Sequence, residues 1–285
     1  MHTEPLTRRN VIKAGVATLG AYVSAPLLAG LAAPGAAIAA ASCARATPEL
    51  TEGPYWVNTM LRRSDVRRNS AGGTGAQRGV PLDLFINVLD TSRGCRPMNG
   101  VAVDIWHANA HGLYSDEPAQ SASGGTSSAN ADTRGEDWLR GYQITGRDRG
   151  LSHRPRDGQV SFRTVWPGWY AGRAIHIHVR VRKLSGSGAT IAGYTTQIFF
   201  SDADNSRVLT AAQPYDARSP QTDPTTDEND SVLTSAARAT NVVAVRGSVA
   251  AGFSAVFNIT LSDAEVGASG TLARPNAGGG APGSA

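Results

Sequence analysis

The sequence is poor in cysteine and lacks the short motifs that mark many metal and nucleotide enzymes. It has two cysteines in 285 residues, so no cysteine cluster is available for a zinc site. It contains no H-E-x-x-H, which argues against a helical zinc hydrolase site. No G-x-G-x-x-G stands between a predicted strand and a predicted helix, so no organic cofactor is predicted.

The chain also lacks a strong or patterned charge. Its formal net charge is +4, and half of that comes from residues 1–41, where three basic side chains stand against Glu4. Lysine and arginine form no stripe interleaved with aromatic residues. We therefore expect no nucleic-acid partner.

Long amphipathic helical patterns are missing after the first forty residues, and short apolar runs take their place. The 32 glycines and 15 prolines between these runs favour strands and turns. Leu82, Leu84 and Ile86 alternate with other side chains, as in a strand with one buried face. Strands are predicted at 80–89, 101–106, 138–145, 159–165, 176–182, 192–200, 241–247 and 254–261, with a short helix around 206–212.

One domain is predicted for residues 43–265, because neither an internal repeat nor a linker divides them. The fold class is all-β, a β-sandwich with long loops and little helix. Residues 266–285 are rich in glycine, proline and alanine, and we expect a disordered tail there.

Residues 1–41 have the features of an export signal. Residues 7–13 (TRRNVIK) form a twin-arginine pattern, followed by a mildly apolar stretch and by small residues with A-x-A cleavage sites. A membrane anchor is the alternative, but Pro26 and Pro34 interrupt the stretch. We expect transport by the twin-arginine translocon to an extracellular or periplasmic location. This route carries folded proteins and so suggests a cofactor inserted before export.

Cys43 and Cys95 both follow the predicted cleavage region. An exported protein meets an oxidising environment, so the pair suggests one disulfide that fixes the mature N-terminus to the domain. Lipidation of Cys43 is the alternative, although the sequence before it lacks the leucine usual in a lipidation signal.

His176 and His178 are separated by one residue in a predicted strand, within residues 167–197. Residues i and i+2 of a strand point to the same face, so both imidazoles can reach one ion. The alternate residues Ile175, Ile177 and Val179 are then expected to face the core. Two histidines on a polar strand face are more often ordinary surface residues, so this pair alone leaves both interpretations open.

The identity of a metal depends on the further ligands. A zinc site needs a third nitrogen or oxygen ligand, which one more histidine could supply. A ferrous site typically has two histidines and a carboxylate, but no carboxylate lies at short spacing from His176. A tyrosine phenolate is a hard anionic donor that suits ferric iron. For His107 we expect a structural hydrogen bond, while the role of His111 stays open.

Several segments together resemble the intradiol ring-cleavage dioxygenases, which include catechol and protocatechuate dioxygenases and exported relatives. The resemblance covers most of residues 43–261 and rests on a tyrosine, a second tyrosine and H-x-H in this order. The segments are TPELTEGPYW (47–56), VDIWHANAHGLYS (103–115), DWLRGYQ (137–143), FRTVWPGWYAGRAIHIHVRV (162–181) and TTQIFF (195–200).

The resemblance implies a mononuclear Fe(III) site in a β-sandwich. The implied metal ligands are Tyr114, Tyr170, His176 and His178. Tyr170 is implied to be the ligand that leaves when the substrate binds. Arg173 and Gln197 are implied to line the pocket, with Arg173 stabilising the charge that develops on the substrate.

The implied reaction is insertion of O2 into a catechol-type ring, with cleavage between the two hydroxyl-bearing carbons to give a muconate-type diacid. The chain departs from the family in two respects: few residues separate Tyr170 from His176, and the helical N-terminal dimerisation region of the catechol enzymes is missing. A homodimer is therefore an open expectation. Two alternatives also stay open: a zinc or copper enzyme using His176 and His178, and a non-catalytic transthyretin-like binding module.

Overall fold

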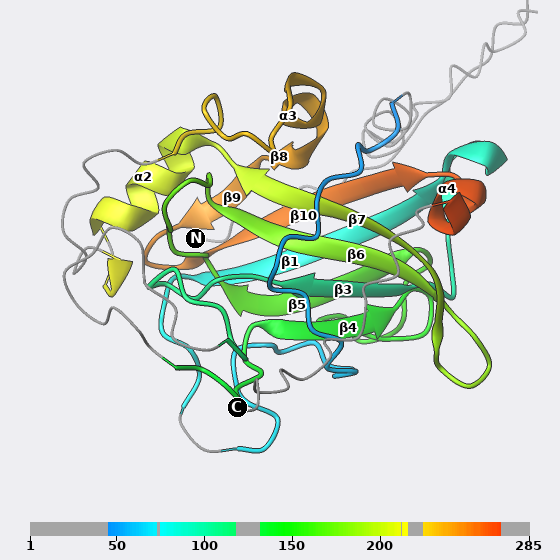
Figure 1. Ribbon diagram of the computed structural model, residues 1–285, viewed down its shortest axis with the longest axis horizontal. Helices are drawn as coiled ribbons and strands as arrows, with labels where there is room; N and C mark the ends of the chain where they lie inside the picture. Colours follow the sequence, from blue (N-terminus) through cyan, green and yellow to red (C-terminus); the bar gives the residue numbers. More distant parts are fainter. Residues whose placement is uncertain (1–44, 73–74, 118–131, 212, 216–224, 269–285) are drawn as a thin grey trace, which may run out of the picture.

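A computed structural model of the protein describes residues 45–72, 75–117, 132–211, 213–215 and 225–268. Strands dominate this part and form two five-stranded sheets, which confirms the predicted all-β class (Figure 1). None of the helices in these residues is long and apolar enough to cross a membrane. The predicted signal at 1–41 lies outside the described residues, as does Cys43.

The first sheet is built around β1, which runs parallel to β10 and antiparallel to β2 and β5. The short helix η1 (Thr91–Arg93) connects β1 to β2. At one edge of this sheet, β9 pairs with β10. The strands are β1 (Pro81–Asp90), β2 (Arg96–Pro97), β5 (Gln159–Val165), β9 (Val245–Ser248) and β10 (Gly252–Leu261).

The second sheet carries the residues of interest and has the order β4-β3-β6-β7-β8. Its pairings are antiparallel except that β7 and β8 are parallel. The strands are β3 (Ala102–Trp106), β4 (Arg140–Ile144), β6 (His176–Leu184), β7 (Thr190–Phe200) and β8 (Val242–Val243).

The hydrophobic core lies between the two sheets. On β1, every second residue is buried, and Leu82, Leu84 and Ile86 are fully inaccessible. Facing them from the second sheet are Ile177 and Val179 of β6, which belong to the same hydrophobic cluster. Burial of one such side chain stabilises the fold by about 1.5–3 kcal/mol, so this alternation fixes which face of each strand is turned inward.

β6 is buried on its outer face as well. His176, His178 and Arg180 point away from the core, yet they are only 2 %, 1 % and 3 % exposed. The intervening Ile177 and Val179 face inward, so the predicted alternation of this strand is confirmed. A polar face this deeply buried requires partners that satisfy its hydrogen bonds.

An N-terminal arm, residues 45–66, covers this outer face. Figure 1 shows it in blue, crossing in front of β7, β6 and β3. Backbone bonds fix the arm at both ends: Leu50 N donates to Thr195 O at 2.9 Å, and Arg63 N donates to Tyr142 O at 3.1 Å. The arm is therefore a third layer over the second sheet.

Two predicted boundaries are wrong. Residues 241–247 do not form one strand, because the chain changes sheets there: β8 pairs with β7 and β9 pairs with β10. Residues 266–268 are not tail, because α4 (Asp263–Ala268) includes them and Val266 is buried in the core. Ser262 and Glu265 form a reciprocal cap at the start of α4, a signal the sequence contains.

Two further helices, α2 and α3, lie in the chain between β7 and β8. α2 (Asp202–Ala211) directly follows β7 and contains residues 206–211 of the helix predicted around 206–212, while residue 212 lies outside the described residues. α3 (Ser235–Asn241) leads into β8 and was not predicted. Thr234 caps α3 by accepting a hydrogen bond from Ala237 N, with a separation of 3.2 Å.

Candidate active site

Four potential metal-binding atoms converge at one end of the second sheet. His176 and His178 lie at the start of β6, Tyr114 on the loop after β3, and Tyr170 on the loop between β5 and β6. The histidine Nε2 atoms are 3.0 Å apart, and Tyr170 Oη is 3.1 Å from His176 Nε2. Tyr114 Oη is 3.4 Å from His176 Nε2 and 3.5 Å from Tyr170 Oη. The structure thus brings together all four side chains predicted as metal ligands.

Both histidines are in the neutral form that binds metals. His176 Nδ1 lies 2.6 Å from Ala174 O, which fits a proton on Nδ1 and a lone pair on Nε2. Burial, assisted by the charge of Arg173, lowers the pKa of His176 to about 3. Burial and the neighbouring His176 lower the pKa of His178 well below its ordinary value. His178 is held flat against Trp106, with ring centroids 4.7 Å apart.

The two tyrosines differ in exposure. Tyr114 is 1 % exposed and stacks on Tyr55 with ring centroids 4.2 Å apart, while Tyr170 is only partly buried. Burial raises the pKa of both phenols, and the charge of Arg173 acts in the opposite direction on each. A bound cation favours the charged form of such groups, so a metal ion here would convert phenol to phenolate.

This donor set fits a hard, highly charged ion. Donors that share one ion at about 2.0–2.2 Å lie about 3 Å apart when they are neighbours around it. The separations here run from 3.0 to 3.5 Å. Across the described ranges, no group of three or more His, Cys, Asp or Glu side chains is placed to hold a metal. The two imidazoles are thus completed by phenol oxygens, the donors that suit ferric iron.

Arg173 and Gln197, predicted as pocket residues, lie beside the four donors. Gln197 is directly opposite His178 in the β6–β7 pairing. Arg173 Nη2 donates to Gln197 Oε1 at 2.6 Å, and Gln197 Nε2 donates to Thr51 O of the arm at 2.7 Å. Arg173 Nη1 is 3.5 Å from His176 Nε2. A positive charge therefore stands at the edge of the donor set.

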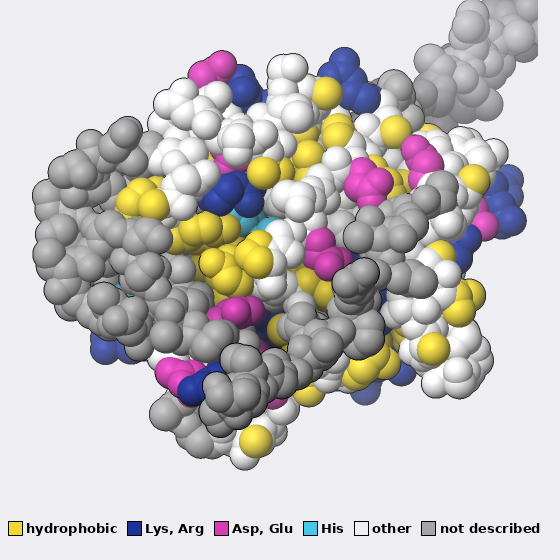
Figure 2. Space-filling model, in the orientation of Figure 1, with side chains coloured by type: hydrophobic (Ala, Val, Ile, Leu, Met, Phe, Trp, Pro, Cys, Tyr) yellow, Lys and Arg dark blue, Asp and Glu magenta, His cyan; other side chains and the backbone are white. Residues whose placement is uncertain are grey.

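The arm and the surface around it shape the approach to the donors. Gly53 has φ +69°, and a Cβ there would lie 3.4 Å from His178 Cε1, so the backbone turns closely over the imidazole. Figure 2 shows a small patch of histidine among hydrophobic side chains, next to a basic one, on the face that the arm crosses. Hydrophobic walls with a few polar groups are typical of sites for small aromatic molecules.

Arg140 ties the arm to the segment that carries Tyr114. Its Nη1 donates to Tyr55 O at 2.6 Å, and its Nη2 and Nε donate to Ser115 O and Oγ at 2.6 and 2.8 Å. Tyr55 stacks on Tyr114, and Ser115 is its neighbour in the chain. One buried guanidinium thus fixes Tyr114 from two sides.

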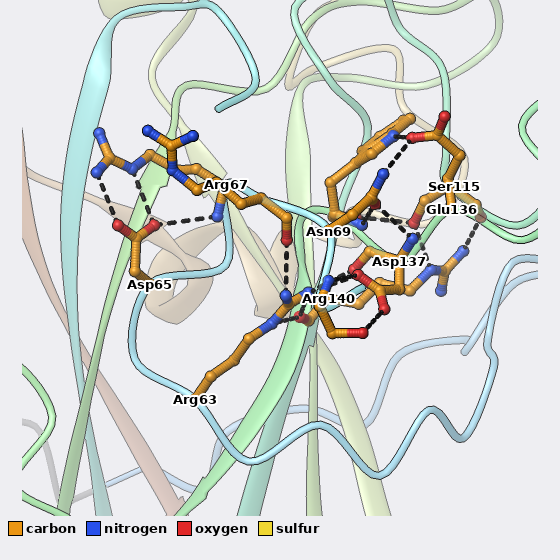
Figure 3. Close-up of polar contacts among 11 residues, drawn as sticks. Arg63, Asp65, Arg67, Asn69, Ser115, Glu136, Asp137 and Arg140 are labelled. Atoms are coloured by element: carbon orange, nitrogen blue, oxygen red, sulfur yellow. Dashed lines mark hydrogen bonds and ion pairs between the residues drawn. The ribbon is translucent and has the colours of Figure 1, made fainter. Parts of the chain in front are cut away.

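A polar network behind Arg140 stabilises this region (Figure 3). Arg63 Nε donates to Arg140 O at 2.9 Å. Asn69 Nδ2 donates to Glu136 Oε2 at 2.9 Å, and Asn69 Oδ1 accepts from Asp137 N at 2.9 Å. The network joins the end of the arm to the start of β4, and so limits the movement of the Tyr114 segment.

The remaining histidines after β3 do not complete the donor set. His107 Nε2 lies 2.6 Å from Thr164 Oγ1 and its Nδ1 lies 2.8 Å from Ala108 O, so the expected structural hydrogen bond is confirmed. Burial lowers the pKa of His107 to about 4. His111 is exposed and lines a separate surface hollow of about 240 Å³ with Gln77.

Sequence reasoning missed two residues that support the site. Arg140 lies in a quoted segment, but nothing in the segment indicates that it holds Tyr55 and Ser115. Asp230 lies in a polar stretch that suggests a solvated loop, yet its side chain is 0 % exposed and pairs with Arg173. Both roles depend on segments that are distant in sequence, so spacing gives no signal for them.

Cys95 is disulfide-bonded. Its predicted partner Cys43 lies outside the described residues, so the pairing stays a prediction.

A comparison with protein families gives one match, the dioxygenase family, over residues 51–219. The matched segment is more than half of the chain and contains the four donors, Arg173 and Gln197. The chain belongs to the dioxygenase family. It is therefore an oxidoreductase that inserts O2 into its substrate, and the resemblance seen in the sequence is confirmed. No curated protein matches the chain.

Solved dioxygenase structures with TM-scores above 0.5 share the fold of this dioxygenase. An intradiol ring-cleavage dioxygenase from Tetranychus urticae is 23% identical, with a TM-score of 0.58, and the match covers 76% of this chain and 94% of that chain. A second dioxygenase crystal structure has 24% identity, a TM-score of 0.57 and the same coverage. The dioxygenase domain of a carbohydrate-binding fusion protein from Streptomyces sp. SirexAA-E is 24% identical over 76% of this chain and 99% of that chain, with a TM-score of 0.47.

The family match ends at residue 219, before Asp230 and α3. The donors and Arg173 thus lie in the part that this dioxygenase shares with its family. The carboxylate that pairs with Arg173 comes from outside the matched segment.

Proposed function

We propose that this dioxygenase is a non-haem Fe(III) enzyme that cleaves catechol-type rings between the two hydroxyl-bearing carbons. The observation that carries the proposal is the convergence of two phenol oxygens and two imidazole Nε2 atoms within 3.5 Å of their neighbours. Tyr114, Tyr170, His176 and His178 would hold the iron. When bound, Fe(III) would supply a Lewis acid that a catechol can chelate through its two oxygens, and this would make the ring reactive toward O2.

The side chains around the donors have separate tasks in this proposal. Tyr170 is the more exposed phenol. It is therefore the one placed to give up its position as an iron ligand and to accept a catechol proton at its Oη. Tyr114 stays fixed by Tyr55 and Arg140. Arg173 Nη1 offers N–H groups to the negative charge that develops on the substrate, in a site where burial strengthens electrostatic effects.

The reaction balances without a further reagent. One C–C bond breaks and both atoms of O2 enter the product, so catechol and O2 together have the composition of cis,cis-muconic acid. No reductant is consumed. This agrees with the absence of a dinucleotide motif in the sequence.

A zinc or copper enzyme at His176 and His178 is less well supported, because both remaining donors are phenols. A non-catalytic module is not compatible with the family.

Oxygen uptake with a panel of catechols tests the proposal. Ring-opened products are identified by chromatography against cis,cis-muconate and 2-hydroxymuconic semialdehyde, which are isomers that mass alone does not separate. We expect muconate-type products, both labelled oxygens from ¹⁸O2, and a reddish protein from tyrosinate–iron charge transfer. A semialdehyde product, or a protein that stays colourless after ferric loading, would refute it.

The cellular location is a separate proposal. We propose export by the twin-arginine route, supported by TRRNVIK at residues 7–13 and by the disulfide at Cys95, which suits an oxidising compartment. Fractionation of the native host, with Arg8 and Arg9 changed to lysine as control, tests it; an unchanged distribution in that variant would contradict the route. Whether the enzyme forms a homodimer stays a prediction for sedimentation analysis.

A further inference from the structure

We propose that Asp230 is a positioning residue, which holds the Arg173 guanidinium in one orientation at the donor set. The proposal rests on the function proposed above, because it assigns Asp230 a part in the same reaction. It goes beyond that function in naming a residue outside the segment that matches the family.

The carboxylate of Asp230 is fully used. Its Oδ2 accepts hydrogen bonds from Arg173 Nε at 2.9 Å and from Ala174 N at 2.6 Å. Its Oδ1 accepts from Val232 N at 2.7 Å and from Leu233 N at 2.9 Å. The side chain of Asp230 is 0 % exposed and forms an ion pair with Arg173. Four donors around a buried carboxylate fix its position as well as its charge.

This arrangement leaves one nitrogen of Arg173 for the site. Nε is bound to Asp230, Nη2 is bound to Gln197, and Nη1 lies 3.5 Å from His176 Nε2. A guanidinium is planar, so two fixed nitrogens define the direction of the third. Asp230 and Gln197 therefore act as a clamp that turns Nη1 toward the donors.

The same chain segment supports both sides of the clamp. Residues 230–241 run from Asp230 through α3 to Asn241, which is fully buried. Asn241 Nδ2 donates to Gln197 O at 2.7 Å and to Thr196 Oγ1 at 2.9 Å. The segment thus fixes Asp230 on one side of Arg173 and β7, which carries Gln197, on the other side.

Loss of the clamp should affect the chemical step more than substrate binding. In the proposed function, Arg173 stabilises negative charge that develops on the substrate during the reaction. Loss of an interaction made only in the transition state lowers kcat without changing KM. A misplacement of about 1 Å can cost on the order of 100-fold in rate. For Asp230→Asn we expect kcat to fall by about 10- to 100-fold, with KM for catechol within about threefold of wild type.

A double-mutant cycle on the iron-loaded full-length enzyme tests the proposal. Asp230→Asn, Arg173→Gln and the double variant are compared with wild type. Glu228→Gln is the matched control, because it makes the same acid-to-amide change two residues away, on a side chain that is 76% exposed and whose ion pair in the described part of the chain is with Arg238. We expect the control to keep wild-type kcat, and Asp230→Asn to change kcat by less than about twofold once Arg173 is gone. An equal loss with and without Arg173 would overturn the proposal.

Asp230→Asn can also fail to fold, because two backbone N–H groups then face an amide nitrogen. Asp230→Glu is the second variant: it keeps the charge but lengthens the arm by one methylene, so it should lower kcat while thermal stability stays near wild type. Wild-type kcat in Asp230→Glu would overturn the proposal.

Crystal structures give a test that is independent of activity. In a folded Asp230 variant, the Arg173 guanidinium should leave Gln197; an unmoved guanidinium contradicts the proposal. A wild-type enzyme inactive on every catechol would instead refute the proposed function and leave this structural test to decide the role of Asp230 as a clamp.

Discussion

The buried ion pair between Asp104 and Arg182 allows a sharp prediction about stability. Arg182 Nε and Nη2 donate to the two carboxylate oxygens at 2.6 and 2.8 Å, and the side chains are 9 % and 1 % exposed. Arg182 Nη1 also donates to Thr190 Oγ1 at 2.8 Å. Its guanidinium lies 5.8 Å from the Trp56 ring and 5.4 Å from the Tyr142 ring. The pair therefore supports the part of the arm that leads to the site.

Arg182→Met should destabilise the protein strongly, because it leaves the carboxylate of Asp104 buried without a partner. Breaking a buried pair from one side costs about 3–5 kcal/mol. For a domain of this size, 1 kcal/mol shifts Tm by about 2–4 °C, so a decrease of roughly 6–20 °C is expected. The double variant Asp104→Leu/Arg182→Met removes both charges and should lie within about 1 kcal/mol of wild type or above it.

Urea unfolding of wild type, Asp104→Leu, Arg182→Met and the double variant at pH 8 measures the coupling free energy between the two side chains. Burial raises the pKa of Asp104 even with Arg182 present, and removal of Arg182 should raise it further. Protonation then removes the charge of the unpaired carboxylate. The loss in free energy of unfolding caused by Arg182→Met, the deficit of this variant, should therefore shrink as pH falls from 8 to 5. The reasoning is refuted if the double variant loses the sum of the two single losses, or if the deficit does not depend on pH.

Three further predictions concern the arm, the tyrosines and pH. Arg140→Met should cost about 2–4 kcal/mol, since three hydrogen bonds are lost while a buried charge is relieved, and should weaken the tyrosinate–iron band; wild-type values in denaturation and absorbance would contradict this. Tyr170→Phe should shift that band and slow substrate chelation in stopped-flow measurements, whereas Tyr114→Phe should mainly lower iron content; identical behaviour of the two would argue against distinct roles. Burial and Asp202 raise the pKa of Asp227 to about 7, so the folded state holds a proton that the unfolded chain releases near pH ~3.9, and stability should fall as pH rises from about 4 to 7. Asp227→Asn should remove this decrease in stability between about pH 4 and 7. An Asp227→Asn variant no more stable than wild type at pH 8 would contradict the prediction.

Local patterns explain why the site strand was predictable. The period of two in β6 places His176 and His178 on one face and Ile177 on the other, and both facts follow from neighbouring residues alone. The full set of metal ligands could not be predicted from local patterns, because Tyr114 and Tyr170 reach the histidines from separate loops. Only the resemblance to a family connected them before the structure placed their oxygens within 3.5 Å of each other.

Long-range pairing explains what the sequence did not reveal. The apolar run at 241–247 has the local character of one strand, yet its halves join opposite sheets, and only the positions of β7 and β10 decide this. Asp230 shows the same limit for a side chain. Its neighbours are polar and give no sign of burial, yet its side chain is 0 % exposed and pairs with Arg173, which lies 57 residues earlier in the chain.

The outer face of β6 links stability to function in this fold. A strand with histidines and arginines on one side needs a cover, and the arm supplies contacts there: Glu52 pairs with Arg180, and Thr51 O accepts from Gln197 of the neighbouring strand β7. The same cover brings Tyr55 onto Tyr114 and Gly53 close to His178. Substitutions that loosen the arm should therefore disturb the donors even where they touch none of them. Inward-facing substitutions on β6 should lower stability first, because those side chains lie on the opposite face of the strand from His176 and His178.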